Sequence, residues 1–225
     1  MKCMPNLEEL NQLALMGVPD GIIDKKQYVC APYKILWILK ETNGQDFELA
    51  WALGYQAKQK NWGGFHKTYR RVVQISSAIL EKNWDSMSDA KQKFPVIIPQ
   101  IAVININKTG GTSKSKHKEI LAYYNQNKQL LMRQTKAINP DVIINANQVN
   151  EMFDKGELFG EVTDRKYKKA CENISSCNKK GTFMIGRLPS TGQLILNVYH
   201  PQSTKLNDVE YFSLVKQCFK EYRLA

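Results

Sequence analysis

Short runs of mainly apolar residues, one of them interrupted by a single asparagine, constrain the fold of this chain more than any other feature. They occupy Ile35–Leu39, Ile101–Ile104, Val142–Ile144 and Leu194–Val198. A run of this length and composition is typical of a strand that is covered on both faces. Because segments with helical periodicity separate the runs, the pattern predicts βαβ units around a mostly parallel sheet. We therefore expect an α/β protein with three layers, α/β/α, and a central, mostly parallel sheet.

The spacing of apolar residues also predicts the remaining elements. Apolar positions three and four residues apart predict helices, and these cover residues 6–16, 47–59, 68–80, 116–137 and 208–222. A further strand is expected over Thr182–Ile185, before the turn signal Pro189–Gly192. We expect one domain over residues 1–225, with residues 1–30 as an N-terminal helical extension and residues 154–180 as a polar, basic insertion.

The charge balance favours an anionic partner. The chain has 32 Lys and Arg against 21 Asp and Glu, which gives a net charge of +11. Such an excess raises the local concentration of a polyanion, although a basic protein with no nucleic-acid role remains an alternative. The five cysteines form no CxxC pair, so neither a zinc nor an iron–sulfur site is predicted. We expect reduced thiols, no metal and no cofactor.

The N-terminus and the apolar runs predict where the protein resides. Residues 1–10 have no apolar core of the kind that signal peptides carry. No apolar run approaches the roughly 20 residues that a membrane-spanning helix needs. We expect a cytoplasmic monomer with no membrane partner.

Polar loops follow the apolar runs, where an open α/β sheet binds its ligands. The loop after the first run holds Glu41, Thr42, Asn43 and Asp46. A carboxylate or amide here could position water for attack on a glycosidic carbon or stabilise an oxocarbenium-like centre. The alternative is a capped turn, in which Asn43 and Gly44 form the turn and Asp46 caps the next helix.

The loop after the last run begins with His200 and Pro201. A histidine at a strand end can donate a hydrogen bond to an oxygen on which negative charge develops, and proline fixes the backbone that leaves the strand. The alternative is a surface or packing histidine followed by ordinary turn residues.

Two asparagines end the second run and alternate with isoleucines, so that Asn105 and Asn107 point to one face. An amide has both donors and an acceptor, which suits the Watson–Crick edge of an extruded base; a loop-capping role is the alternative. The following segment, Lys108–Lys116, is rich in Gly, Ser and Lys and could bind phosphate, or be a solvated linker. It does not match the P-loop pattern, which argues against an ATPase.

Taken together, these loops resemble those of the uracil-DNA glycosylase superfamily over roughly residues 30–220. Its members carry a first motif after the first core strand, an asparagine after a later strand, and a C-terminal motif that begins His-Pro. Here Lys40–Gly44, Ala102–Asn105 and Tyr199–Ser203 stand in those places, in the same order.

The first motif departs from the family pattern. Thr42 stands where the family usually has its catalytic aspartate or asparagine, so Glu41, Asn43 or Asp46 would have to substitute for that group. Gly44 stands where the uracil-specific branch has a tyrosine that blocks the pyrimidine 5-position. The resemblance therefore implies room for a substituent on that carbon.

The resemblance implies a monofunctional DNA glycosylase that hydrolyses the N-glycosidic bond of a flipped-out uracil-like or 5-modified pyrimidine, in DNA repair or antiviral defence. It implies catalytic roles for Glu41, Asn43 and His200. The implied substrate-binding residues are Thr42, Gly44, Asp46, Phe47, Asn105 and Ser203, and the implied contacts to duplex or single-stranded DNA are Lys108, Lys114, Lys116, Lys205 and the candidate wedge Leu206. A nucleic-acid-binding protein that has lost catalysis on the same scaffold, or a small-molecule enzyme such as a nucleoside hydrolase, are the alternatives.

Overall fold

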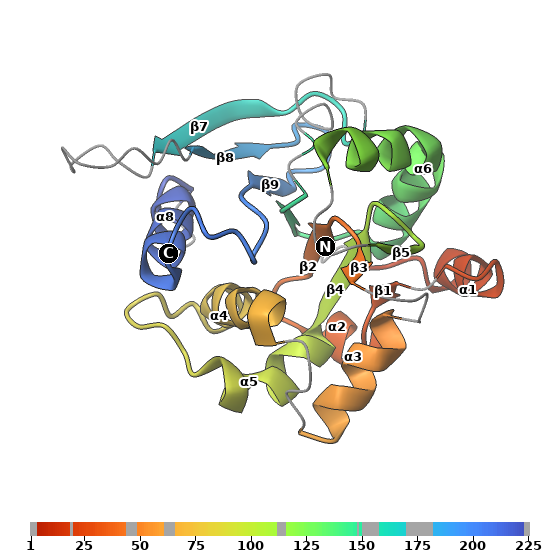
Figure 1. Cartoon of the computed structure of the whole chain (residues 1–225), viewed down its shortest axis with the longest axis horizontal. Coiled ribbons are helices and arrows are strands. Elements are labelled where there is room, and N and C mark those ends of the chain that lie inside the picture. Colours follow the sequence, from red (N-terminus) through yellow and green to blue (C-terminus); the bar gives the residue numbers. More distant parts are fainter. Residues whose placement is uncertain are drawn as a thin grey trace.

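Seven of the described strands form a mixed sheet between two sets of helices (Figure 1), and two others form a separate short ladder. The computed structural model describes residues 4–18, 20–43, 49–60, 66–111, 116–147, 149, 158–169 and 182–222. The helices are α1 (Leu7–Leu15), α2 (Lys25–Cys30), α3 (Leu49–Lys58), α4 (His66–Glu81), α5 (Ala90–Ile97), the 3-10 turn η2 (Ile98–Gln100), α6 (His117–Ile138) and α8 (Asp208–Lys220). The strands are β1 (Gly21–Ile22), β2 (Ile35–Leu39), β3 (Thr42–Asn43), β4 (Ile101–Asn105), β5 (Gly110–Gly111), β6 (Val142–Asn145), β7 (Thr163–Lys169), β8 (Thr182–Arg187) and β9 (Leu194–Asn197).

The main sheet has the strand order β1-β4-β2-β6-β9-β8-β7. Its centre is parallel, because β2 pairs in parallel with both β4 and β6, and β6 pairs in parallel with β9. The pairings of β1 with β4, of β8 with β9 and of β7 with β8 are antiparallel. The α/β class is therefore confirmed, while the sheet is mixed and the expected parallel arrangement holds only for its four central strands.

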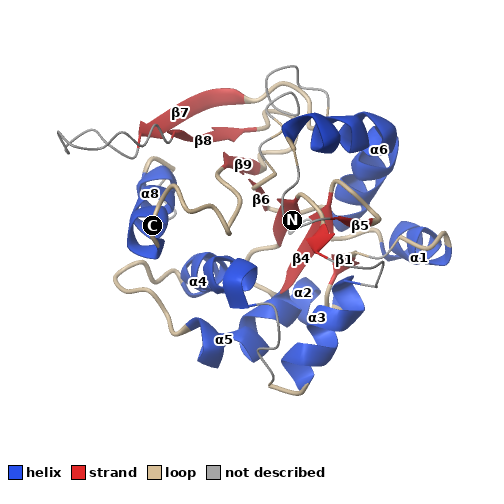
Figure 2. Ribbon diagram, viewed as in Figure 1, coloured by secondary structure: helices blue, strands red, loops and turns tan. Residues whose placement is uncertain are grey.

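Alternation along the strands sends side chains into two separate cores. In β2, Ile35, Trp37 and Leu39 belong to one core, and Leu36 and Ile38 belong to the other. Helices α3, α4, α5 and α8 supply the first core, and α1 and α6 supply the second (Figure 2). Because all five β2 residues are buried, the uninterrupted apolar run is the direct consequence of a strand covered on both faces.

The structure differs from the predicted elements in three places. Ala90–Ile97 forms a helix, α5, that the apolar spacing did not predict, and η2 connects it to the strand that begins at Ile101. The N-terminal extension contributes a strand, because Gly21–Ile22 pairs with β4. Within the expected insertion, Thr163–Lys169 forms β7 at the end of the sheet. An edge strand of this kind can carry charged residues, so it lacks the apolar run that marks the central strands.

The carboxyl ends of the four central strands meet at one edge of the sheet. In register, Leu39 pairs with Asn105, Ile38 with Asn145, and Asn145 with Asn197. The loops that carry the predicted site residues therefore leave the sheet on the same side, as the topology of parallel strands requires. In the described residues, no helix has both the length and the apolar character that crossing a membrane requires.

Candidate functional site

The ends of β2 and β4 are joined by hydrogen bonds that hold Glu41 in place. Asn107 donates from Nδ2 to Glu41 Oε2 over 3.0 Å. The Asn107 amide oxygen accepts from Thr109 N at 3.0 Å and from Thr109 Oγ1 at 2.8 Å, which fixes the orientation of the Asn107 side chain. Beyond these residues, Thr42–Asn43 pairs with Gly110–Gly111 as the short parallel ladder of β3 and β5. The carboxylate of Glu41 is thus fixed by a hydrogen bond at the carboxyl edge of the sheet.

Asn105 has a buried acceptor. The residue is 3 % exposed, and no donor in the described part of the chain hydrogen-bonds to its amide oxygen Oδ1. Leaving a buried acceptor without a donor costs roughly 1–3 kcal/mol. An N–H group brought by a ligand to this end of β4 would remove that cost.

Lys108 has a structural role instead of the predicted DNA contact. Its ammonium group donates to Asp20 Oδ1 at 2.8 Å and to Gln134 Oε1 at 2.7 Å. Asp20 also accepts from the backbone N–H of Asn105 at 2.6 Å. The Lys108 side chain is only 11 % exposed and that of Asp20 is 1 % exposed. This buried pair fixes the end of β4, so we no longer assign Lys108 to phosphate binding.

His200 is neutral over the ordinary pH range. Burial, reinforced by the positive charge of Lys40, lowers the pKa of the imidazole to about 3. Nδ1 accepts a hydrogen bond from the backbone N–H of Gln202 at 3.2 Å. In a neutral imidazole the other nitrogen then carries the proton. His200 therefore presents Nε2–H as a donor, and its loop leaves β9 at the same edge of the sheet as the end of β2.

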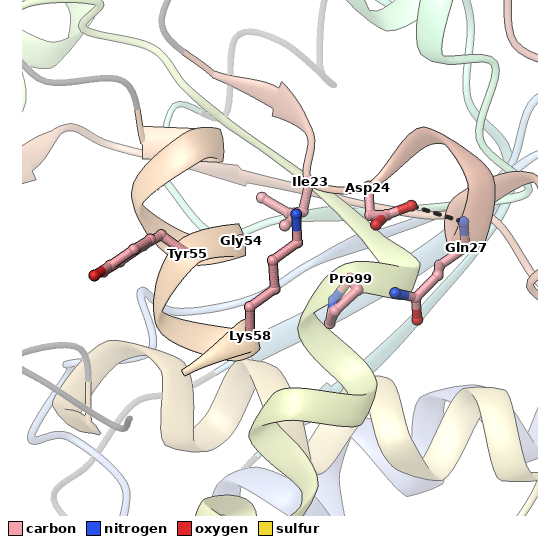
Figure 3. A pocket seen from close by; sticks show the side chains of 7 residues that line it. All are labelled: Ile23, Asp24, Gln27, Gly54, Tyr55, Lys58 and Pro99. Carbon is pink, nitrogen blue, oxygen red and sulfur yellow. Dashed lines mark hydrogen bonds between the residues drawn. The ribbon is translucent and has the colours of Figure 1, made fainter. Parts of the chain in front are cut away.

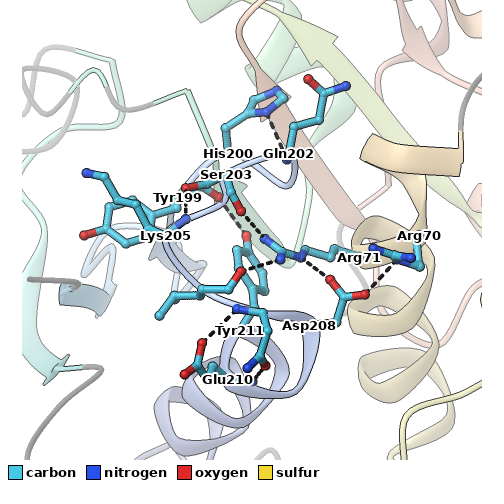
Figure 4. A network of polar contacts seen from close by, with 12 residues as sticks. Arg70, Arg71, Tyr199, His200, Gln202, Ser203, Lys205, Asp208, Glu210 and Tyr211 are labelled. Atoms are coloured by element: carbon cyan, nitrogen blue, oxygen red, sulfur yellow. Dashed lines mark hydrogen bonds and ion pairs between the residues drawn. The ribbon is translucent and has the colours of Figure 1, made fainter. Parts of the chain in front are cut away.

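Arg71, on α4, ties down the loop that begins at His200 (Figure 4). Its guanidinium donates to the carbonyl oxygens of Ser203 and Leu206 at 3.0 and 2.7 Å and to Asp208 Oδ1 at 2.7 Å. The same group lies 4.7 Å from the ring centroid of Tyr211. No sequence pattern marks Arg71, because its partners lie more than 130 positions further along the chain.

The other predicted residues of this loop have different settings. Ser203 Oγ accepts from the backbone N–H of Lys205 at 3.3 Å, so the hydroxyl stabilises the turn. Lys205 is exposed, with its ammonium nitrogen 4.6 Å from the ring centroid of Tyr199. Leu206 is 2 % exposed and belongs to the core under α8. The expectation that Leu206 acts as a DNA wedge is corrected, because its side chain is already packed inside the protein.

A set of asparagines at the ends of β6 and β9 was not predicted as part of the site. Asn145 Nδ2 donates to Asn197 Oδ1 at 3.1 Å, and Asn147 Nδ2 donates to Asn145 Oδ1. Asn147 in turn accepts from the backbone N–H of Val149 at 2.8 Å. The spacing Asn145-Ala146-Asn147, which repeats that of Asn105 and Asn107, was the available signal.

Several predicted residues cannot be placed at this edge. Gly44, Asp46, Phe47 and Lys114 lie outside the described residues, and so do the side chains of Thr42 and Asn43. Lys116 is exposed immediately before α6, where its position is compatible with the predicted phosphate contact.

Residues from α2, α3 and the segments beside them line a small pocket (Figure 3). It has a volume of about 150 Å³ and is lined by Ile23, Asp24, Gln27, Gly54, Tyr55, Lys58 and Pro99. Ile23 donates its N–H to the carbonyl oxygen of Ile101, the first residue of β4. The pocket therefore opens near the amino end of β4, away from Glu41 and His200.

Comparison with known proteins and a search for metal-binding side chains among the described residues were both negative. No protein-family model matches the chain, and no curated protein matches it. Within the described ranges, no group of three or more His, Cys, Asp or Glu side chains is placed to hold a metal ion.

Proposed function

We propose that the chain is a monofunctional DNA glycosylase on a uracil-DNA glycosylase-like α/β/α scaffold, acting on a uracil-like or 5-modified pyrimidine. The observation that carries this proposal is the neutral His200, which offers an N–H donor at the edge where Asn105 ends β4 and Glu41 follows β2. An uncharged donor beside Lys40 suits a leaving group that acquires negative charge, because the donor stabilises the charge as it forms.

The proposed roles follow from the chemistry of each group. The target nucleotide leaves the stack at a cost of a few kcal/mol. The unpartnered Oδ1 of Asn105 accepts an N–H from the base edge. Glu41 orients a water molecule and takes its proton as the water oxygen bonds to the sugar carbon. The glycosidic C–N bond breaks, and its electron pair departs with the base while His200 donates to a base oxygen.

Exposed cations support the choice of DNA as the substrate. Lys116, immediately before α6, and Lys205, in the loop that begins at His200, are exposed, and the chain carries a net charge of +11. Phosphate contacts by such side chains position a nucleic acid without reading its sequence.

A nucleic-acid-binding protein without catalysis is the second candidate, favoured by Thr42 at the usual catalytic position. The two candidate functions are distinguished by incubating the protein with oligonucleotides that carry uracil, hydroxymethyluracil or hydroxymethylcytosine and then cleaving abasic products with alkali. The proposed glycosylase function predicts cleavage of at least one oligonucleotide by wild type and no cleavage by Glu41→Gln or His200→Ala. Saturable DNA binding with no abasic product on any substrate supports the binding protein instead.

A further inference from the structure

The edge strand β7 is strongly basic. Its sequence, TDRKYKK, contains four basic residues and one acidic residue. The side chain of Lys166 is 48 % exposed and that of Lys168 is 28 % exposed. Since β7 ends the strand order of the described sheet, one of its edges is not paired within that sheet.

Lys166 and Lys168 project from the same face of the sheet as the His200 loop. Opposite them in register are Ile185 and Phe183, which belong to the core that α8 covers. Tyr167 projects from the other face, since it pairs with Met184 of the second core. The two lysines therefore lie on the side of the sheet from which the His200 loop runs to α8.

Contacts between aromatic rings connect this basic strand to the candidate site. Tyr199 directly precedes His200, and its ring centroid lies 5.6 Å from that of Phe183 in an edge-to-face arrangement. Phe183 is the register partner of Lys168. Lys205 lies against the same Tyr199 ring, 4.6 Å from its centroid. Lys168 and Lys205 are thus both linked to the segment that positions His200.

The acidic partners of these lysines are partly exposed to solvent. Lys166 is 3.5 Å from Asp164, whose side chain is 57 % exposed. Lys168 pairs with Glu221, whose side chain is 35 % exposed. Exposed ion pairs contribute little to stability and are screened by salt, so a phosphate group can compete for both ammonium groups.

We propose that Lys166 and Lys168 of β7, continued by Lys205, bind successive backbone phosphates of the DNA strand that carries the extruded nucleotide. This inference rests on the proposed function, because it places the bound strand next to His200. It assigns to β7 the phosphate contacts that Lys108 cannot make, since the Lys108 ammonium is buried against Asp20.

The test compares Lys166→Gln/Lys168→Gln with wild type in titrations of a fluorescent oligonucleotide at several salt concentrations. Each lost phosphate contact lowers the slope of log K against log salt by about 0.7 to 0.9. The double variant should therefore bind more weakly at low salt, with a slope about 1.4 to 1.8 smaller. Wild-type affinity and slope in the double variant would overturn the proposal, as would tighter binding of RNA of the same sequence.

Two control variants separate local from general effects. Lys26→Gln/Lys91→Gln removes the same charge from exposed positions on α2 and α5, and should leave the salt slope unchanged. Tyr167→Ala alters the exposed residue on the other face of β7 and should also leave it unchanged. An equal loss of slope in the α2/α5 control would mean that only net charge matters, which overturns the assignment to β7. Thermal unfolding of all variants confirms that each is folded.

Base release measured on the same samples distinguishes failure of this inference from failure of the proposed function. At subsaturating protein, base release by the double variant should fall in parallel with its DNA affinity, because the two lysines bind the substrate strand. Base release by wild type with unchanged binding in the double variant overturns the β7 assignment alone. If DNA binding depends on the two lysines but no base is released, the proposed phosphate contacts of β7 are supported and the proposed glycosylase function is refuted.

Discussion

Replacing Arg71 with methionine should destabilise the protein far more than the same change at its neighbour Arg70. Both arginines contact the carboxylate of Asp208, at 2.7 Å for Arg71 and 2.8 Å for Arg70. Their environments differ, because the side chain of Arg71 is 8 % exposed and that of Arg70 is 51 % exposed. The pair is therefore a matched comparison of a buried and an exposed arginine on one acceptor.

The magnitude follows from the groups that each change leaves behind. Without Arg71, the carbonyl oxygens of Ser203 and Leu206 lose the donors at 3.0 and 2.7 Å. A buried acceptor without a donor costs about 1–3 kcal/mol, so the loss of both donors should lower the free energy of unfolding by about 2–6 kcal/mol. Arg70→Met removes an exposed ion pair, for which a loss of at most about 1 kcal/mol is expected.

Urea unfolding of the two variants measures this difference, and the pKa of His200 provides an independent readout. Release of the loop in Arg71→Met should hydrate the imidazole, so the pKa of His200 should rise from about 3 toward its ordinary value. NMR titration of the ring protons would detect the rise. Equal destabilisation by the two variants, with an unchanged His200 pKa, would refute the assignment of Arg71 as the residue that positions the loop.

Three other predictions concern acid stability, the buried ion pair and β8. Because the pKa of His200 is lowered to about 3 in the folded protein, the unfolded state takes up the proton first as pH falls below 6.5. Wild type should therefore lose more stability between pH 6.5 and pH 4 than His200→Gln does in thermal unfolding, and parallel losses would contradict this. Lys108→Met should lower the free energy of unfolding by about 3–5 kcal/mol, because it leaves the Asp20 carboxylate buried without its cation; weaker DNA binding with unchanged stability would restore the phosphate role. Gly186→Ala should destabilise by about 1–3 kcal/mol in urea unfolding, because the added Cβ would lie 2.4 Å from a Val162 methyl carbon; a neutral effect would show that Val162 can move.

The central strands could be predicted because their sequence reflects only their own burial. Trp37 and its neighbours in β2 are apolar on both faces, and this requires no knowledge of which helices cover them. The carboxyl ends of such strands meet by topology, so the grouping of Glu41, Asn105 and His200 at one edge also followed from the sequence.

Elements at the margin of the sheet could not be predicted in the same way. β7 ends the strand order of the described sheet, and Lys166, Tyr167 and Lys168 are partly exposed on its two faces, so no alternation of apolar and polar residues appears. In α5, Pro95 stands inside the helix, where proline ordinarily argues against helical structure. The local sequence pattern therefore predicts neither the strand β7 nor the helix α5.

The partners of site residues were beyond prediction because they come from distant parts of the chain. Asp20 lies 88 positions before Lys108, and only the antiparallel pairing of β1 with β4 brings its carboxylate to the ammonium group. From the sequence alone, Lys108 is therefore indistinguishable from an exposed loop lysine that could contact phosphate. Leu206 likewise stands in a polar turn, and its burial follows from the docking of that turn on α4 through Arg71.

The most direct test of the central claim is the single-turnover rate of base release by wild type and His200→Ala on a cleaved substrate from the modified-pyrimidine panel. A neutral donor to the departing base predicts a rate about 10²- to 10³-fold lower in the variant, with unchanged DNA affinity. For wild type it predicts no loss of rate from imidazole protonation between pH 8 and pH 5, because the pKa of His200 is about 3. Equal rates in the two proteins, or a wild-type rate that falls with a midpoint near pH 6.5, would contradict the account.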